Sequence, residues 1–361
     1  MKSKDLQKKI IITGTHLTPA VELISQLKKD SKTKWQIYYI GRQYNSSVDT
    51  TPSIESEIIP KLGVNFSSIV CGKLDRRWLP NTIQGIPQTI KGVIQAYNQV
   101  SKIKPDIVAS FGGYVSVPVI ISSWLKRIPS ITHEQTPTIS LTTKINSLFV
   151  NKVALSFENK DQTEKSVITG NLLRSEIYNQ SSKYFEKIIK KNQSPIIYIT
   201  AGNQGSKTIN DTIKLILSNL KDFTIIHQTG KTDYSKFKKL TQKYKNYYPI
   251  EYVNSNDIGW IFSNSKILIS RSGANTSQEI VALKKSSILI PLFKSQQDEQ
   301  KINASWVKKQ LPDKTIIIQQ EELNKKSLLE GILKLNKLKV SSSKITYQPN
   351  LKLLNLINKL I

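Results

Sequence analysis

The amino-acid sequence predicts an α/β protein with two parallel sheets, each in its own domain. Short apolar runs alternate with amphipathic helical stretches along the chain, which is typical of βαβ units. This alternation weakens once, over residues 157–177, and then starts again. A length of 361 residues is also more than one hydrophobic core usually holds.

The first half of the chain shows the alternation clearly. The predicted strands are KIIIT (9–13), WQIYYI (35–40), DIVASF (106–111) and SITHE (130–134). The predicted helices include PAVELISQLKKD (19–30) and SVPVIISSWLKR (116–127). Continuous apolar runs fit buried parallel strands, and apolar residues three or four apart fit helices that cover them.

The second half repeats the pattern. Its predicted strands are SPIIYIT (194–200), FTIIHQTG (223–230), PIEYVN (249–254), KILIS (266–270) and SSILIPL (286–292). The last stretch, YQPNLKLLNLINKLI, has apolar residues at helical spacing. We therefore predict a first domain over residues 1–165, a second over 166–340, and a C-terminal closing helix within 341–361 that packs back toward the first domain.

The composition limits the possible partners. A formal charge of +27 would attract nucleic acid, anionic lipid or a diphosphate. Only six of the basic residues are arginines, and an abundance of Lys, Asn and Ile fits compositional bias equally well. No arginines cluster among aromatic residues, so we do not expect nucleic acid as a partner.

Cysteine usage and hydropathy both bear on the compartment in which the protein is expected. The single cysteine fits a reducing compartment. Cys71 is the single cysteine, so it forms no internal disulfide, and no structural zinc site is expected. The N-terminus has no signal-peptide pattern, and no run of 18 apolar residues occurs. The cytosol is the simplest expectation.

Small-residue turns follow four of the predicted strands, in ITGTHLTPA, FGGYVSVPVI, ITAGNQGSKTIND and SRSGANTSQEI. Ligands of open parallel sheets bind beyond the carboxyl ends of the strands, and a helix N-terminus after such a turn suits a phosphate. In the last motif Glu279 could accept from both hydroxyls of a ribose. The alternative is an N-capped helix with a solvated glutamate.

The three histidines lie near the carboxyl ends of predicted strands or just after them. His227 is interpreted as a structural residue at a strand end, whereas His16 and His133 lie in the first domain and could face one ligand. No D-x-D sequence and no histidine pair at metal-ligand spacing occurs, so no metal site is expected. Helix ends and basic side chains would then carry the phosphate charge.

At this point the chain resembles the MurG-type UDP-N-acetylglucosamine transferases over nearly its full length. The likeness lies in FGGYVSVPVI, RIPSITHEQ, SRSGANTSQEIVALKKSSILIPL and QDEQKINA, with weaker echoes in GTHLTPA, SEIIPKLGVNF, GNLLR and AGNQGS. The resemblance implies two Rossmann-like domains of the GT-B fold. It also implies an inverting, metal-independent transfer from UDP-GlcNAc, a substrate, to an undecaprenyl-diphosphate muramoyl peptide in peptidoglycan synthesis, with no cofactor.

The resemblance also implies site residues. The donor set is Arg174, Gly202, Asn203, Gln204, Gly205, Asn210, Tyr252, Val253, Ser272, Gly273, Ala274, Glu279, Asp298, Gln300 and Asn303. The acceptor set is Gly14, Thr15, Gly112, Gly113, Tyr114, His133 and Gln135. His16 is the leading candidate for the general base, with Glu134 as its competitor.

The departures from the family pattern lie mostly on the acceptor side. The first loop retains only Gly14 where the family has several glycines, HEQN is HEQT here with Thr136, and the donor turn reads AGNQG. These departures indicate either a divergent acceptor or a reduced activity. The other candidate functions are a GT-B glycolipid transferase, a nucleotide-sugar epimerase and a noncatalytic nucleotide-binding protein.

A lipid-linked acceptor implies contact with an anionic membrane surface, and we expect a peripheral protein at the cytoplasmic face. Lys73–Leu79 sets Leu74, Trp78 and Leu79 beside basic residues and is the predicted contact. Isoleucines and a tyrosine then follow on one helical face, which we interpret as the core-facing side of a helix: Ile83, Ile86, Ile90, Ile94 and Tyr97.

Overall fold

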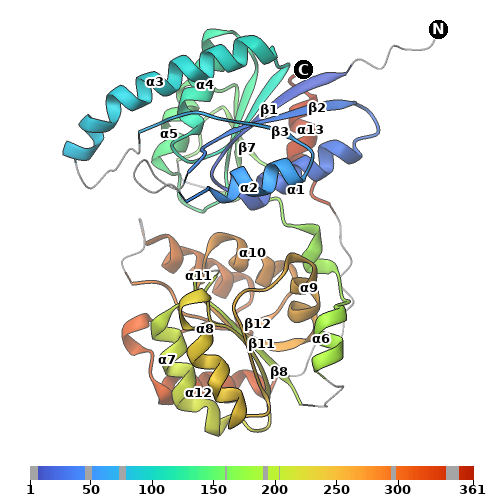
Figure 1. Ribbon diagram of the computed structural model, residues 1–361, viewed down its shortest axis with the longest axis vertical. Helices are drawn as coiled ribbons and strands as arrows, with labels where there is room; N and C mark the ends of the chain where they lie inside the picture. The colour runs from blue at the N-terminus through green and yellow to red at the C-terminus, as the bar shows by residue number, and fades with distance from the viewer. Residues whose placement is uncertain are drawn as a thin grey trace. The chain divides into compact units, whose positions relative to one another are not determined.

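The computed structural model describes residues 7–44, 51–72, 79–158, 161–189, 194–202, 204–293, 298–338 and 349–361, with the backbone alone for 79–86. It divides the chain into two compact units (Figure 1). Unit 1 comprises Met1–Arg174 and Pro349–Ile361, and unit 2 comprises Ser175–Gln348. The predicted segment Lys73–Leu79 lies outside the described residues, apart from the backbone of Leu79.

Unit 1 contains a seven-stranded parallel sheet in the order β3-β2-β1-β4-β5-β6-β7. Its strands are β1 (Lys8–Gly14), β2 (Trp35–Gly41), β3 (Asn65–Ser68), β4 (Ile107–Phe111), β5 (Ser130–Glu134), β6 (Lys152–Leu155) and β7 (Ser166–Ile168). Its helices are α1 (Leu17–Lys29), α2 (Ile54–Lys61), α3 (Leu79–Ile103), α4 (Ser116–Leu125), α5 (Leu141–Phe149) and α13 (Lys352–Asn358).

Unit 2 contains a six-stranded parallel sheet in the order β10-β9-β8-β11-β12-β13. Its strands are β8 (Ile196–Thr200), β9 (Thr224–Gln228), β10 (Tyr247–Ile250), β11 (Ser265–Ser270), β12 (Ser286–Leu289) and β13 (Thr315–Ile317). Its helices are α6 (Lys183–Ile188), α7 (Lys207–Ile216), α8 (Lys231–Lys238), α9 (Ser255–Asn264), α10 (Ala274–Ala282), α11 (Glu299–Gln310) and α12 (Lys325–Asn336).

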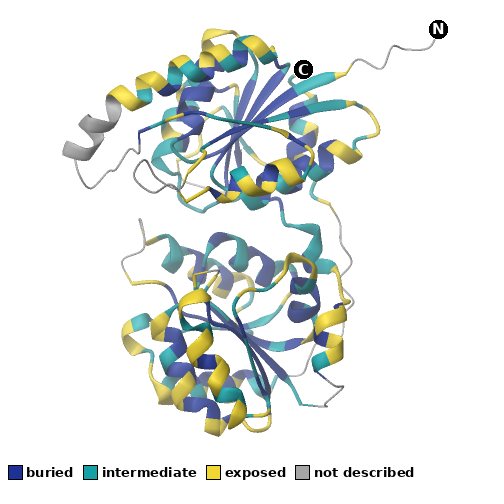
Figure 2. Cartoon of the chain, viewed as in Figure 1, coloured by how far each residue is buried: buried dark blue, intermediate teal, exposed yellow. Residues whose placement is uncertain are grey.

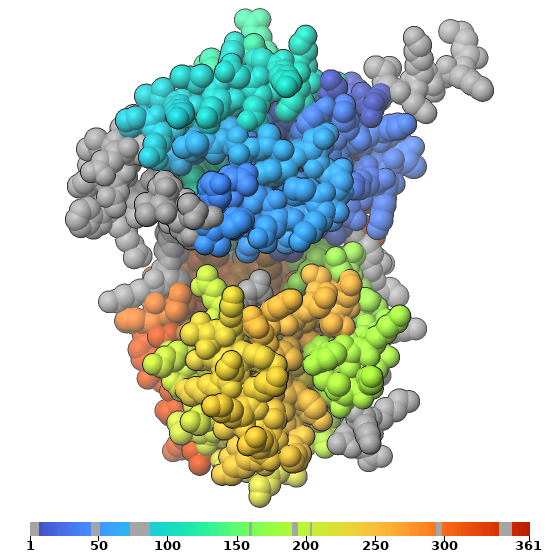
Figure 3. All heavy atoms as spheres, in the orientation of Figure 1, coloured from blue at the N-terminus to red at the C-terminus, as the bar shows by residue number. Residues whose placement is uncertain are grey.

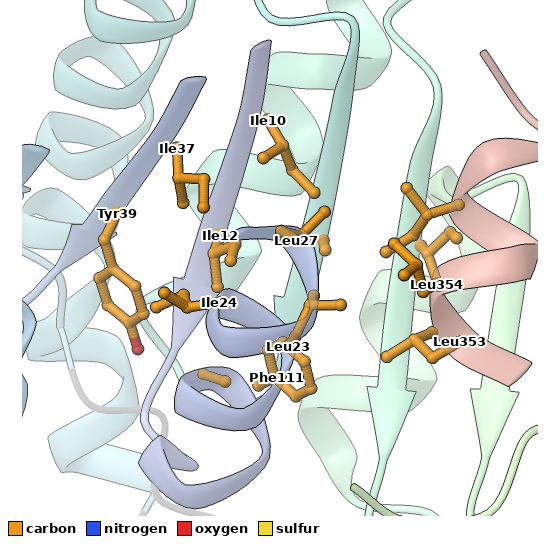
Figure 4. Close-up of a cluster of buried hydrophobic side chains, with 14 of the residues drawn as sticks. Ile10, Ile12, Leu23, Ile24, Leu27, Ile37, Tyr39, Phe111, Leu353 and Leu354 are labelled. Atoms are coloured by element: carbon orange, nitrogen blue, oxygen red, sulfur yellow. The ribbon is translucent and has the colours of Figure 1, made fainter. Parts of the chain in front are cut away.

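Both faces of the first sheet are buried, as the continuous apolar runs predict (Figure 2). Successive strand residues face opposite sides. Ile10 and Ile12 pack with α1 and with Leu353 of α13 (Figure 4), whereas Ile11 packs with residues of α3 and α4. The C-terminal helix therefore completes one face of the first core, although it follows all of unit 2 in the sequence.

The division between the units differs from the predicted boundary at 165/166. Residues 166–168 form β7, which pairs with β6, so unit 1 continues to Arg174. The strand predicted over 249–254 is also displaced, because β10 ends at Ile250 and residues 251–254 form a loop.

Strand order fixes where a ligand can bind in each unit. The order reverses between β1 and β4 in unit 1 and between β8 and β11 in unit 2, and chain connections leave a crevice at such a switch point. The four small-residue turns of the sequence follow these four strands.

Candidate active site

The turns at the first switch point are packed directly against each other. Gly14, Gly112 and Gly113 all have positive φ angles, of 134°, 66° and 76°. A Cβ atom on Gly14 would lie 2.7 Å from the carbonyl carbon of Phe111, and one on Gly113 would lie 2.1 Å from Oγ1 of Thr15. The shortened first loop therefore still needs its one remaining glycine.

His16 stands at the start of α1, beside the glycine turn that follows β4. Its Nδ1 lies 2.8 Å from Nε2 of Gln135, and a Cβ on Gly112 would lie 3.3 Å from its Nε2. Burial lowers the pKa of His16 below its usual value, although the nearby Glu134 carboxylate acts in the opposite direction. His16 is therefore neutral near pH 7, which is the form that a general base requires.

Glu134 has a different role. Its Oε1 accepts from the Thr136 hydroxyl at 2.8 Å, and its Oε2 accepts from the backbone N–H of Ser140 at 3.0 Å. Ser140 in turn caps the N-terminus of α5. Glu134 therefore holds the loop between β5 and α5 in place, and this geometry favours His16 over Glu134 as the base.

His133 lies on the core-facing side of β5, which argues against its predicted acceptor contact. It shares a face of β5 with the core residue Ile131, and only 3% of it is exposed. Its Nε2 donates to the carbonyl of Gly170 at 3.2 Å, and its ring lies 5.4 Å from that of Phe111. Burial lowers its pKa to about 4.

Sequence reasoning missed Arg42, which directly follows β2 at the same edge of the sheet. Its Nε donates to Oε1 of the buried Glu55 at 2.7 Å. Burial opposes its charge, yet hydrogen bonds with Tyr114 and Glu55 raise the pKa of Arg42 overall. A fixed positive charge therefore lies beside Tyr114, one of the predicted acceptor residues. The sequence feature that could have identified Arg42 is its place as a basic residue just after a predicted strand.

At the second switch point, α10 begins at Ala274 directly after the turn that follows β11. Gly273 occupies the N-cap position without a side-chain hydrogen bond to the helix, and a Cβ there would meet nothing within 4 Å. The first backbone N–H groups of α10 thus have no side-chain cap. This is the arrangement that binds a phosphate.

Three predicted donor residues form one connected structure. The Ser272 hydroxyl donates to the backbone carbonyl of Gln300 at 2.7 Å, and Nδ2 of Asn303 donates to the Ser272 carbonyl at 3.0 Å. The Gln300 side chain accepts from the backbone N–H of Leu292 at 3.0 Å. Asp298, with a φ of 52°, stands at the start of α11. The first turn of α11 is therefore fixed against the turn between β11 and α10.

The arginine that precedes this turn was also missed. The Arg271 guanidinium donates to the Ser206 hydroxyl at 2.8 Å and to the carbonyl groups of Ile290 and Pro291 at 3.1 and 3.2 Å. It thus joins the segments that follow β8 and β12 to the end of β11. The β8 turn itself requires glycine, since a Cβ on Gly205 would lie 2.0 Å from the Thr229 carbonyl oxygen.

Two predicted donor residues are more buried than the sequence suggests. Glu279 is only 1% exposed, so it is not the open carboxylate of the prediction. Asn210 is internal: its Nδ2 donates to Thr229 and Asp233, and its Oδ1 accepts from Nε2 of His227 at 3.0 Å. We therefore remove Asn210 from the donor contacts. His227, fully buried, has the structural role expected for it.

Four of the remaining predicted donor residues lie in unit 2 turns and loops. Tyr252 is 65% exposed in the loop after β10, with Val253 beside it, and Gly202 and Gln204 are exposed. Arg174 is the last residue of unit 1, and Asn203 lies outside the described residues. Within the described ranges no three His, Cys, Asp or Glu side chains are grouped as a metal site would require.

Two parallel α/β sheets, each with glycine turns at its switch point, are the architecture of the GT-B fold. The chain belongs to glycosyltransferase family 28: residues 10–155 match the family's N-terminal domain and residues 196–352 its C-terminal domain. These findings confirm the predicted fold class and the resemblance stated above.

Two curated relatives carry the name UDP-N-acetylglucosamine–N-acetylmuramyl-(pentapeptide) pyrophosphoryl-undecaprenol N-acetylglucosamine transferase. The Clostridium tetani protein is 33% identical over 91% of this chain and 89% of its own length. The Geobacillus thermodenitrificans protein is 35% identical, with 91% of both chains covered.

Solved structures agree on the fold. Acinetobacter baumannii MurG has a TM-score of 0.71 at 21% identity, covering 98% of this chain and 99% of its own. UDP-GlcNAc 2-epimerase from Methanocaldococcus jannaschii has a TM-score of 0.63 at 14% identity, covering the same shares of the two chains.

Proposed function

We propose that this glycosyltransferase moves N-acetylglucosamine from UDP-GlcNAc to a muramoyl peptide carried on undecaprenyl diphosphate. The observation that carries the proposal is the 33–36% identity, over about 90% of the chain, to relatives named for this reaction. The retained glycine turns at both switch points support it. No cofactor is required by the proposal.

Unit 2 is the proposed donor site. The uncapped N-terminus of α10 would bind the UDP diphosphate, and the backbone of Tyr252 and Val253 would contact the uracil. Glu279 would accept from the ribose hydroxyls. Because Glu279 is buried, we infer that the ribose reaches it deep in the site, where a charge-assisted hydrogen bond is strong.

Unit 1 is the proposed acceptor site, and the reaction is a single displacement. The acceptor hydroxyl oxygen forms a bond to C1 of N-acetylglucosamine while the bond from C1 to the UDP oxygen breaks, which inverts the anomeric centre. Nε2 of His16 takes the hydroxyl proton. The α10 N-terminus stabilises the negative charge on the leaving UDP, so the proposal needs no metal ion.

Measurement of UDP release with and without the lipid-linked acceptor tests this function. Acceptor-dependent release is expected. An epimerase, the alternative suggested by the structural neighbours, would convert UDP-GlcNAc without acceptor, and a noncatalytic binding protein would release no UDP. His16→Ala should lower turnover roughly 100-fold or more while UDP affinity stays unchanged.

We also propose that unit 1 contacts an anionic membrane surface at the cytoplasmic face. The stripe on α3 was predicted to face the core, and this is wrong for its described part: Ile90 and Ile94 are 57% and 58% exposed, because Ala96 and Val100 fill the buried face instead. Figure 3 shows α3, in cyan, at the surface of unit 1. No helix within the described ranges is long and apolar enough to cross a membrane.

The exposed apolar residues extend from α3 onto the end of α4. Lys126, which follows α4, lies 4.2 Å from the ring centre of Tyr97, and Trp124 and Leu125 beside it are about half exposed. Apolar side chains next to basic ones suit a headgroup region. Ile90→Glu with Ile94→Glu should abolish binding to anionic vesicles, whereas the same change at Leu215 and Leu333 of unit 2 should not.

The segment Lys73–Leu79, predicted from the sequence as a membrane contact, allows a second test of membrane binding. Replacement of Arg76 and Arg77 by alanine should weaken vesicle binding more than the same change at Lys238 and Lys239, and salt should release the protein. Equal effects of the two pairs would mean that binding depends on diffuse charge rather than on a local contact.

A further inference from the structure

His16 must carry its single ring proton on a particular nitrogen to act as a base. Nδ1 faces Gln135 at 2.8 Å, and Nε2 lies in front of Gly112, at the turn where the proposed acceptor approaches. A neutral imidazole has one N–H donor and one lone-pair acceptor. Only the tautomer with the proton on Nδ1 leaves the Nε2 lone pair available to the acceptor hydroxyl.

The carboxamide of Gln135 decides between the two tautomers. Its amide nitrogen, the atom facing Nδ1, donates and so requires the His16 proton on Nε2. A half-turn about the last torsion angle presents the amide oxygen instead, and that oxygen accepts from Nδ1–H. Once Nε2 has taken a proton, both ring nitrogens are donors, so an amide nitrogen at Nδ1 would then repel the imidazolium.

We propose that Gln135 is a positioning residue that sets the His16 tautomer: its amide oxygen accepts from Nδ1–H, before and after proton transfer, and Nε2 accepts the acceptor proton. This inference rests on the proposed function. It reassigns Gln135, which the sequence analysis had placed among the acceptor contacts.

The surroundings of Gln135 suit this role. It is 7% exposed and follows two residues with fixed positions, since His133 is anchored to Gly170 and Glu134 ties the loop to Ser140. Within this His-Glu-Gln run, the side chain of Gln135 makes the hydrogen bond with the His16 ring. These two anchors hold the carboxamide of Gln135 beside the ring of His16.

The ring nitrogens can be read directly by NMR on protein labelled with ¹⁵N at histidine. The chain has three histidines, and two of them are internal standards. His133 donates from Nε2 to a carbonyl, and His227 donates from Nε2 to Oδ1 of Asn210, so both carry the proton on Nε2. The His16→Gln variant identifies the His16 signals by their loss.

We expect the His16 signals to show the proton on Nδ1, opposite to both standards. A His16 proton on Nε2 would overturn the proposal and make His16 a hydrogen-bond donor to the acceptor. This measurement needs no turnover, so it decides the tautomer even if the wild type shows no acceptor-dependent UDP release, which would instead count against the proposed function.

The kinetics of Gln135 variants provide a second test of the proposal. Gln135→Glu can only accept from Nδ1, so it should keep turnover and move the acid limb of the pH profile to higher pH, by roughly one pKa unit. Gln135→Leu should lower kcat about 10- to 100-fold with little change in the KM for UDP-GlcNAc. Gln242→Leu, at an exposed glutamine of unit 2, is the control. Equal kcat values for wild type and Gln135→Leu would also overturn the proposal.

Discussion

Replacement of Gly112 by alanine tests whether the second glycine turn sets the position of His16. The new methyl group would lie 3.1 Å from Cδ2 and 3.3 Å from Nε2 of His16, so the ring must move by a few tenths of an ångström. A φ of 66° also costs alanine about 1 kcal/mol relative to glycine. We expect turnover to fall roughly tenfold or more, because reacting groups tolerate little displacement, while UDP affinity is unchanged.

Gly63→Ala provides a matched control for backbone strain. Gly63 has a φ of 65°, and the nearest neighbour of its new methyl would be the flexible tip of Lys28 at 4.0 Å. Thermal unfolding should show a similar loss in both variants, about 2–4 °C for each kcal/mol in a unit of this size. Only Gly112→Ala should lose turnover. Wild-type turnover in Gly112→Ala would refute the claim that this turn positions His16.

Three further predictions concern the donor site, the metal ion and acid stability. Glu279→Gln should weaken UDP binding roughly tenfold or more in a titration, and Glu330→Gln, at an exposed glutamate of the same unit, should not. EDTA should leave UDP release unchanged, and loss restored by magnesium would show a metal-dependent reaction. Burial lowers the pKa of His227 to about 3, below its unfolded value near ~6.5, so the unfolded chain binds the proton more tightly. The free energy of unfolding should thus fall as pH drops below about 6.5, and in urea titrations at pH 7 and pH 5 it should fall less for His227→Gln.

The sequence predicts the two sheets well because their central strands are long and continuously apolar. The strands without a prediction are short and mostly at or near sheet edges. Asn65–Ser68 and Ser166–Ile168 have no fully buried residue, so their composition resembles that of a loop. Missing Ser166–Ile168 is also the reason that the boundary between the units was placed too early.

Site residues on the turns were easier to predict than those on the elements themselves. Glycines after a central strand have one evident reason to be there, and the parallel sheet brings them together at one edge. His133 and Asn210 match family positions, but each points into a core. Alternation along β5 was enough to place His133 on the side of Ile131, and the neighbours Ile209 and Ile213 were a sign that Asn210 lies on a buried part of its helix.

The N-termini of the helices explain how one topology gives two sites. The helices that follow the four switch-point strands are α1, α4, α7 and α10, and none of them has a side-chain N-cap. Each of the helices α2, α5, α6, α9 and α12, which start elsewhere, has a Ser or Asn cap. At α7 the N-cap serine is present, but its hydroxyl accepts from Arg271.

A missing cap costs about 1 kcal/mol, or only a few tenths where glycine stands at the N-cap as it does at α10, so the four helix starts at the two switch points together lose some stability. The absence alone is not specific, since α8, α11 and α13 also lack a side-chain cap. What is specific is that none of the five helices with a described side-chain cap starts at a switch point. Backbone N–H groups that no side chain occupies can bind an anion, and both proposed substrates contain a diphosphate. The unfavourable helix starts therefore lie where a diphosphate would supply the missing hydrogen-bond acceptors.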